Sequence, residues 1–129
     1  MDINVNIKVG RLTKDSEITH TSSGAAILNF TIAVSHMKKK DGTSETSFFQ
    51  CKAFGKLAEN LKPYLTKGKQ VSIKGYDKQE RWEKDGQQQS RVIIYCEDIE
   101  LLGGKSNGNS QSEPSVNGAP DYGDYYSYN

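Results

Sequence analysis

Aromatic and cationic side chains alternate along residues 46–54 in a pattern that suits contact with nucleic acid. At the two-residue period of a strand, one face carries a compact apolar set: Phe49, Cys51 and Ala53. The opposite face places Lys52 between Phe48 and Phe54. At about 3.3 Å per residue the two rings lie roughly 20 Å apart, so each would stack on its own nucleotide while the lysine meets phosphate. The alternative is a strand buried between two cores.

The chain's single tryptophan marks a second candidate site. Residues 77–84 are almost entirely polar and reverse at Asp85-Gly86, a hairpin signal. Trp82 therefore lies where no core can receive it, with Lys78 and Arg81 nearby for phosphate. The alternative is a tryptophan that packs across its own hairpin.

Further cations complete the candidate surface for single-stranded nucleic acid. They are Lys8, Arg11, Lys38 and Lys56. Lys38 opens a run of three lysines in the loop before the aromatic strand, where the loop can fold over a bound strand. The alternative for Lys8, Arg11 and the lysine run is a solvated surface cation.

The composition limits how such a surface can bind. A chain of 129 residues with 34% hydrophobic content makes one domain, which we expect over residues 1–104. That region carries 16 basic and 13 acidic side chains, so its net charge is only +3. Stacking must therefore supply much of the affinity, because so few charges cannot coat a duplex. Residues 105–129, rich in Gly, Ser, Asn and Tyr, predict a disordered tail.

Other functional classes find little support in the sequence. His20 and His36 have no acid or nucleophile at a fixed spacing, and we see no metal-ligand cluster and no glycine loop for phosphate, so we expect neither an enzyme nor a cofactor or metal. Cys51 and Cys96 lie in apolar strand patterns and predict core thiols in a reducing compartment. Without a signal peptide or membrane-spanning run, we expect a cytoplasmic protein that does not contact the membrane.

The order of elements predicts how these residues are positioned. Strands are expected over residues 5–12, 27–35 and 46–54, then a helix, then a long hairpin of residues 71–82 and 91–102. Gly10 is expected to bend the first strand, and a short edge segment follows at residues 18–21. The helix is expected to end at Gly68, although Pro63 should kink or shorten its last turn. One face of the helix carries an apolar stripe: Leu57, Leu61, Tyr64 and Leu65.

The last strand carries apolar residues on both faces, and its register shifts at Glu97-Asp98. We interpret its second face, with Ile93 and Tyr95, as a subunit interface. Five strands with one helix between the third and the fourth are the order of the OB-fold, an all-β five-stranded Greek-key barrel that commonly binds oligonucleotides.

Several motifs occur in the order and spacing of one known family. They are Gly10-Arg11-Leu12-Thr13-Lys14-Asp15, Phe30-Thr31-Ile32-Ala33-Val34, Phe54-Gly55-Lys56-Leu57-Ala58-Glu59, Tyr64-Leu65-Thr66-Lys67-Gly68, Gly75 and Arg81-Trp82. Over residues 1 to about 102 the chain resembles the bacterial single-stranded DNA-binding proteins. The resemblance implies a nucleoid-associated homotetramer that wraps single-stranded DNA without sequence preference in replication, recombination and repair. Phe48 falls where the family commonly has a stacking tryptophan, and Phe54 and Trp82 match its stacking aromatics directly.

The sequence departs from that family in three places. Residues 36–40 lack the expected loop aromatic, and Asp15-Ser16-Glu17 replaces the usual Asp-Pro-Glu. Residues 121–129 lack the acidic Pro-Phe tip through which the family recruits replication and repair enzymes, so we do not carry that partner function over. A phage, plasmid or mobile-element version, or a second cellular copy with its own partners, would fit these departures. The alternative function is an OB-fold interaction subunit of a primosome-type assembly, in which the aromatic face contacts protein.

Overall fold

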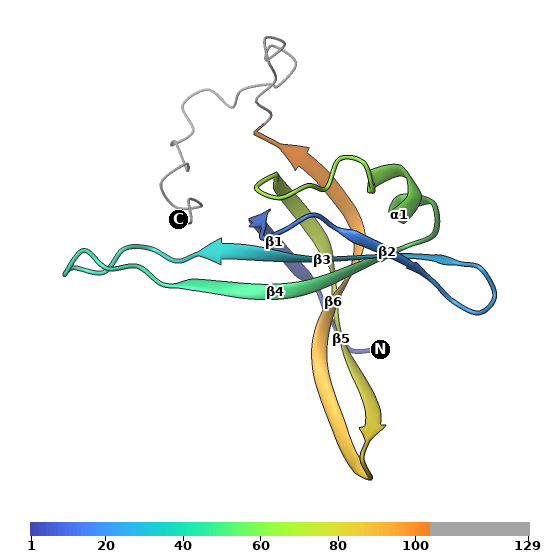
Figure 1. The fold of residues 1–129 in the computed structure, drawn as a ribbon. Helices are drawn as coiled ribbons and strands as arrows, with labels where there is room; N and C mark the ends of the chain where they lie inside the picture. The colour runs from blue at the N-terminus through green and yellow to red at the C-terminus, as the bar shows by residue number, and fades with distance from the viewer. Residues whose placement is uncertain (104–129) are drawn as a thin grey trace.

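Five strands close into a barrel and a sixth extends it, in residues 1–103, the part of the chain that the computed structural model describes (Figure 1). The order across the sheet is β1-β5-β6-β4-β3-β2, and β1 also pairs with β3. The elements are β1 (Asn6–Leu12), β2 (Glu17–His20), β3 (Ala26–Ser35), β4 (Thr46–Phe54), α1 (Gly55–Leu61), β5 (Gln70–Lys84) and β6 (Gln87–Leu102). The predicted OB-fold is confirmed, and β2 is the expected edge segment. The predicted tail from residue 105 lies outside the described residues.

The barrel closes where β1 changes partner. β1 pairs with β5 from Asn6 to Arg11 and with β3 at Arg11 and Leu12. A Cβ atom at Gly10 would lie 2.7 Å from the carbonyl oxygen of Ala33, so only glycine lets the two strands approach this closely. The bend expected at Gly10 thus coincides with the closure of the barrel.

The core follows the predicted strand alternation. Leu28, Phe30 and Ile32 of β3 are buried, whereas the intervening Asn29 and Thr31 are only half-buried. Opposite them lie buried side chains of β4, β5 and β6: Cys51, Ala53, Val71, Ile73, Ile94 and Cys96. One face of β4 is thus committed to the core, which leaves its other face at the surface.

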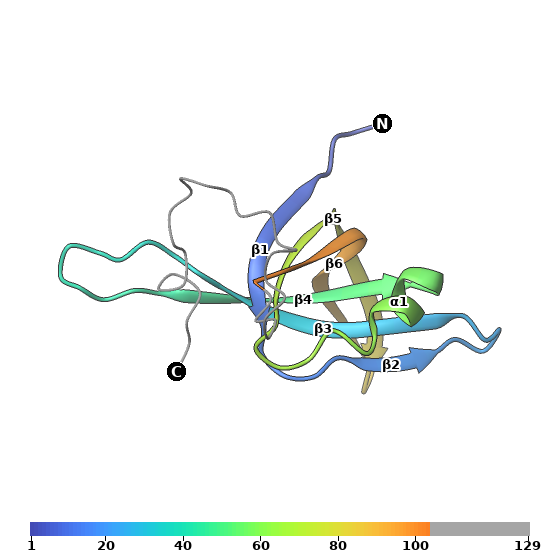
Figure 2. The same cartoon turned by 90° about the horizontal axis from the view of Figure 1, so that it is seen from above.

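Helix α1 lies at the end of β3 and β4 that is opposite their long loop (Figure 2). It buries Ala58 and ends at Leu61, before the predicted end of the helix at Gly68. Because Pro63 has no backbone N–H, the chain turns there, and the N–H groups of Tyr64 and Leu65 both bond to the carbonyl of Leu61. Leu65 still enters the core, but Tyr64 is exposed, which corrects its place in the predicted stripe.

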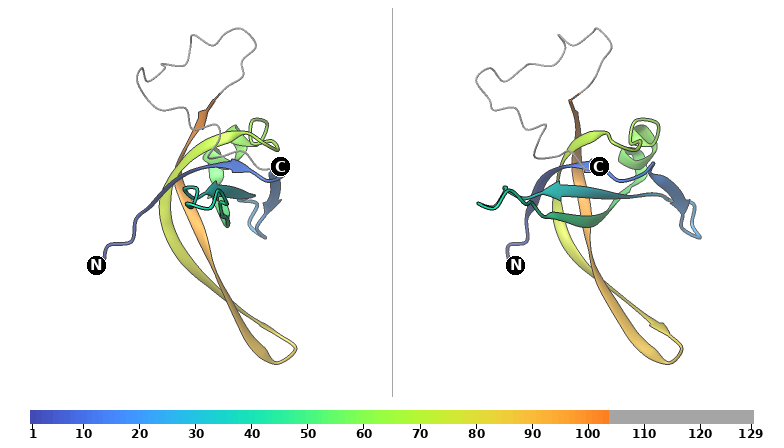
Figure 3. Two further views of the ribbon diagram at one scale, coloured as in Figure 1. Left: turned by 90° about the vertical axis from the view of Figure 1, so that its left-hand side faces the viewer. Right: turned by 60° about the vertical axis from the view of Figure 1, so that its left-hand side comes forward.

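The hairpin of β5 and β6 projects from the barrel as an arm (Figure 3). The two strands pair from Gln70 and Leu102 to Lys84 and Gln87, and Asp85 and Gly86 turn with positive φ of 52° and 77°, as the predicted Asp-Gly hairpin requires. The pairing shifts between Lys74 and Gly75, which leaves Glu97 without an opposing residue. The register shift predicted at Glu97-Asp98 is therefore confirmed.

The second face of β6, with Ile93 and Tyr95, is covered within the single chain, which corrects its interpretation as a subunit interface. Ile93 is only 2% exposed within the single chain, and the ring of Tyr95 packs against Phe54 and Tyr76. Side chains of the neighbouring strands therefore cover this face without a partner subunit. Val92, on the other face, is the exposed residue.

Candidate functional site

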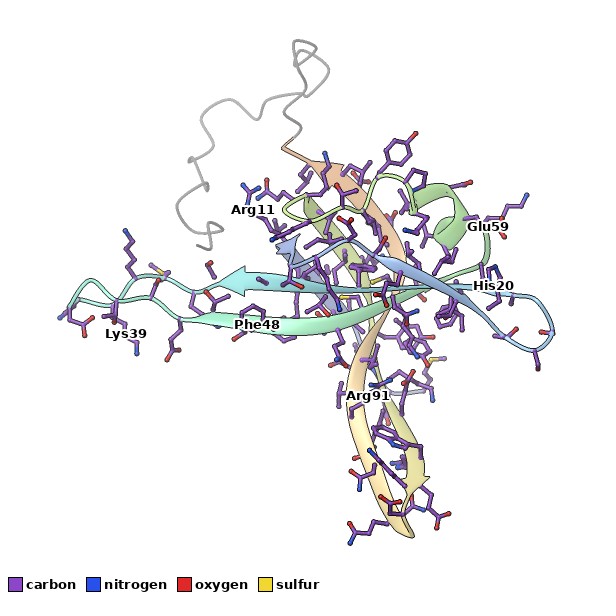
Figure 4. All side chains as sticks on the ribbon, viewed as in Figure 1. Arg11, His20, Lys39, Phe48, Glu59 and Arg91 are labelled. Carbon is purple, nitrogen blue, oxygen red and sulfur yellow. The ribbon has the colours of Figure 1, made fainter. Side chains whose placement is uncertain are left out.

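The outer face of β4 leaves two phenylalanine rings open to solvent. Phe48 is 63% exposed and Phe54 is 39% exposed, whereas Cys51 and Ala53 on the inner face are buried. Figure 4 shows Phe48 on the part of β4 that runs out beside β3, away from the arm. The structure thus rules out burial of this strand between two cores and places both rings as the sequence predicts.

Phe49 occupies an intermediate position on the core side of β4. Its ring is half-buried at the margin of the core, and the Lys8 Nζ atom lies 4.3 Å from the ring centroid. Such a contact is a cation–π interaction, which holds the ammonium of Lys8 over the ring. Lys8 remains near Phe48 and Gln50, because all of them line one open hollow.

Trp82 lies on the arm and is 40% exposed. The guanidinium carbon of Arg91, from the opposite strand, lies 5.1 Å from the centroid of its ring. One side of the indole is thus covered across its own hairpin, as the alternative predicted, while two fifths of the residue stays open. The open side of Trp82 lines a groove together with Lys78, Arg81 and Tyr95.

Two tyrosines that the sequence did not assign to DNA binding join this surface. The ring centroids of Phe54 and Tyr95 are 5.0 Å apart at an interplanar angle of 55°, and those of Tyr95 and Tyr76 are 5.8 Å apart at 52°. These tilted contacts stabilise aromatic pairs. Strand parity shows that Tyr76 and Trp82 share a face of β5, but only the pairing of three strands brings Tyr95 to Phe54.

Glu80 connects the arm to β4. Its Oε2 atom accepts hydrogen bonds from Lys52 Nζ at 2.8 Å and from the Tyr95 hydroxyl at 2.6 Å, and its Oε1 atom accepts one from Arg91 Nη2 at 3.3 Å. Desolvation would raise the pKa of Glu80, but the hydrogen bonds from Lys52 and Tyr95 outweigh it and lower the pKa to about 2. Desolvation and the hydrogen bond to Glu80 raise the pKa of Tyr95 to about 12.

Because the pKa of Glu80 is lowered in the folded protein, the free energy of unfolding should fall as the pH is lowered. The ionised carboxylate contributes its full stabilisation above its usual pKa of 4.5 and loses it as the pH falls toward 2. We expect urea unfolding to show wild type more stable than Glu80→Gln at pH 7, with the difference shrinking between pH 4.5 and pH 2. A difference that stays constant over this range would contradict the assignment.

The predicted cations differ in how free they are. Lys52 is only 19% exposed and is paired with Glu80, and the Arg11 Nη1 atom donates a hydrogen bond to the Gly68 carbonyl at 3.2 Å. Arg81 bonds to Gln79 at 2.6 Å but is exposed. Exposed cations without a recorded ion pair lie on the arm, on α1 and in the loop after β3: Lys78, Lys56 and Lys38. Lys78 and Arg81 line the groove beside Trp82, and Lys52 is joined to it through Glu80. Three other predicted cations do not line that groove: Lys38, Lys56 and Arg11.

Three hollows on the described surface share lining residues. The hollow beside Phe48 shares Thr31 and Gln50 with a second, polar hollow. That second hollow is also lined by Lys14, Asn29 and Lys52. That polar hollow shares Arg91 with the groove beside Trp82, and Figure 4 shows Arg91 where the arm leaves the barrel. A continuous track therefore runs from Phe48 over the outer face of β4 to Trp82, and Phe54 borders it through the ring of Tyr95, which lines the groove beside Trp82. We call it the aromatic track.

Other types of site are not found in residues 1–103. This part of the chain has no group of three or more His, Cys, Asp or Glu side chains that could hold a metal ion. Within the same residues, no helix is long and apolar enough to cross a membrane.

The two cysteines are expected to be inert in the native protein. Both are free and buried, and hydrogen bonding with the Cys96 thiol together with burial raises the pKa of Cys51. Since the thiolate is the reactive form, we expect an aromatic disulfide reagent at pH 7 to modify no thiol in the folded protein and both in urea. Rapid labelling of the folded protein would contradict this placement.

Comparison with known proteins identifies relatives of the whole described region. Residues 3–102 match the Single-strand binding protein family. The Single-stranded DNA-binding protein of Treponema pallidum is 39% identical over 114 residues, which cover 87% of this chain and 65% of that protein. The corresponding protein of Borreliella burgdorferi is 40% identical over 120 residues, which cover 90% and 80%. The aligned region thus spans just under two thirds of the Treponema protein.

Two solved structures are also similar. A Plasmodium falciparum SSB in complex with ssDNA superposes with a TM-score of 0.71 at 18% identity, over 80% of this chain and 97% of that one. A deletion mutant of the single-stranded DNA binding protein from Thermus aquaticus superposes with a TM-score of 0.68 at 27% identity, over 80% of this chain and 52% of that one. The first likeness supports the fold alone.

Proposed function

Because this chain belongs to the Single-strand binding protein family, we propose that it binds single-stranded DNA without sequence preference and protects it during replication, recombination and repair. The observation that carries the proposal is the aromatic track, on which Phe48, Phe54 and Trp82 are all 39% exposed or more. Every base has a π-face, so stacking on these rings tolerates any sequence. No bond is made or broken in this role, which is that of a binding protein and not of an enzyme.

The described residues divide the work between rings and charges. Bases stack on Phe48, Phe54 and Trp82, each stack contributing about 1–3 kcal/mol. Lys78 and Arg81 lie in the groove beside Trp82 and are placed to meet the backbone phosphates there. Lys8 serves the Phe48 end of the track, and the outlying Lys38, Lys56 and Arg11 extend the positive surface around it.

We propose further that the protein works as a homotetramer. The N-terminal segment and β1 leave a row of apolar side chains exposed: Met1, Ile3, Val5 and Ile7. Val92 of β6 is exposed as well. An apolar row of this kind is typical of a surface that another subunit covers. Native mass measurement is expected to give four chains, and a monomer at micromolar concentration would refute the assembly.

The binding proposal is tested by titration with oligo-dT of increasing length. Trp82 is the only tryptophan, so its fluorescence reports directly on stacking at the arm, and we expect it to be quenched. Absence of quenching at micromolar protein would refute the proposal. If Phe54→Ala instead abolished capture of a protein partner and left oligonucleotide binding intact, the track would serve the primosome-type interaction.

Binding to exposed single strands would bring the protein to the nucleoid, which is the location we propose. Recruitment of replication and repair enzymes is not proposed, because the segment that would carry it lies outside the described residues. The comparison proteins bear names that describe DNA binding and no such partner.

A further inference from the structure

Glu80 is a carboxylate in the middle of a surface that should attract DNA phosphates. We propose that Glu80 holds Lys52 and Arg91 in an internal ion-pair network that withdraws both cations from phosphate, so that the aromatic track binds chiefly by stacking. This inference rests on the proposed function. It assigns Glu80 as the residue that sets how much of the affinity is electrostatic.

The contacts of Lys52 carry the first step. Its Nζ atom lies 2.8 Å from Glu80 Oε2, and the two side chains are only 19% and 18% exposed. A pair that is this shielded from water is screened far less than a surface pair, so releasing Lys52 to a phosphate would leave Glu80 with only the longer ion pair to Arg91. The lysine between Phe48 and Phe54 is therefore not the phosphate contact that its place in the sequence predicts.

Arg91 carries the second step. Its Nη2 atom lies 3.3 Å from Glu80 Oε1 while its guanidinium rests over the ring of Trp82. Glu80 thus fixes a cation against one stacking ring. Through the Tyr95 hydroxyl it also fixes the tyrosine that packs against the other ring, Phe54. A single carboxylate positions the surroundings of both rings and occupies the two nearest positive charges.

The salt dependence of binding is the property that this arrangement should set. For a single strand, log Kobs falls against log salt with a slope of about −0.7 for each phosphate that a cation neutralises. Cations that are already neutralised by Glu80 release no counterions on binding. We therefore expect a shallow slope for the wild-type protein and a steeper one when the carboxylate is replaced.

The experiment measures oligo-dT affinity for Glu80→Gln between 50 and 500 mM NaCl. Freeing one or both cations should steepen the slope by about 0.7 to 1.4. Over this tenfold range in salt, the affinity of the variant relative to wild type should change by about 5- to 25-fold, with the advantage at low salt. A role in folding or ring placement alone would weaken binding equally at every salt concentration, so an unchanged slope overturns the proposal.

Three further variants keep the result specific. Glu83→Gln removes the same charge from the same arm at an exposed residue with no recorded ion pair, and should steepen the slope by less than half as much. Lys78→Gln, an exposed cation in the groove, should flatten the slope by about 0.7. Glu80→Gln with Lys52→Gln should lose the part of the increase that comes from Lys52. Equal effects of Glu80→Gln and Glu83→Gln would show a general charge effect and overturn the proposal.

The outcomes also separate this inference from the proposed function. If wild type does not quench Trp82 fluorescence with oligo-dT, the proposed function itself fails. If wild type binds and Glu80→Gln keeps the wild-type slope, only the role of Glu80 fails. Urea unfolding of each variant at pH 7 confirms that the compared proteins are folded.

Discussion

Trp82→Ala is expected to weaken binding of oligo-dT by about 5- to 150-fold, the equivalent of the roughly 1–3 kcal/mol that one base stack contributes. The indole is 40% exposed on a polar arm, so its removal opens no cavity in the core. Because the variant lacks tryptophan, binding is measured by the fluorescence anisotropy of a labelled oligo-dT. Phe54→Ala, on β4, should cause a loss in the same range.

Tyr64→Ala provides the matched control for the loss of an exposed ring. Tyr64 is 57% exposed, but it follows α1 and lines none of the three hollows of the aromatic track. Among the ring contacts of the described residues it also has none to a lining residue, whereas Phe54 packs against Tyr95. Its removal should change the affinity by less than about twofold. Equal losses for Tyr64→Ala and Trp82→Ala would show that any exposed aromatic serves and that the track has no special role.

Gly75→Ala is expected to destabilise the fold by about 3 kcal/mol or more, at the upper end of what overpacking causes. A Cβ atom at Gly75 would lie 1.9 Å from the carbonyl oxygen of Tyr95 and 2.9 Å from the Cα atom of Cys96. Both are backbone atoms, so no side-chain rotation relieves the clash. The free energy of unfolding from urea titration measures the loss.

The neighbouring Lys74→Ala is the control for Gly75→Ala, since Lys74 is exposed on the same strand beside the same irregularity. It should change the free energy of unfolding by less than about 0.5 kcal/mol. Gly75→Ala should also disturb the arm, because the shift between Lys74 and Gly75 sets which residues of β6 oppose Glu80 and Trp82. A fully stable Gly75→Ala protein would show that β5 can slide past this point.

Much of the candidate site could be predicted from local pattern. The two-residue period of β4 sends Cys51 and Ala53 to the core and leaves Phe48 and Phe54 outside, because side chains alternate across a strand whatever its partners are. The polarity of residues 77–84 likewise leaves Trp82 without a core to enter. Pro63 shortens the helix for a reason that the residue carries itself, its missing N–H.

The charges of the site could not be predicted in the same way. Lys52 looks like a free phosphate contact in the sequence, yet Glu80, 28 residues later, neutralises it. Tyr95 looks like a residue for a subunit interface, yet Phe54 and Tyr76 cover its ring. Each of these contacts depends on the pairing of β4, β5 and β6, and the register shift at Gly75 changes which residues of β6 lie opposite β5.

By itself, therefore, the sequence determined which side chains leave the core: the rings of Phe48, Phe54 and Trp82, through periods that span a few residues. Only the tertiary structure decided which of the outward charges are free and how the rings are joined into one track. The physical reason is the range of the interactions. Alternation is local to a strand, whereas an ion pair such as Lys52 with Glu80 exists only after distant strands have closed into the barrel.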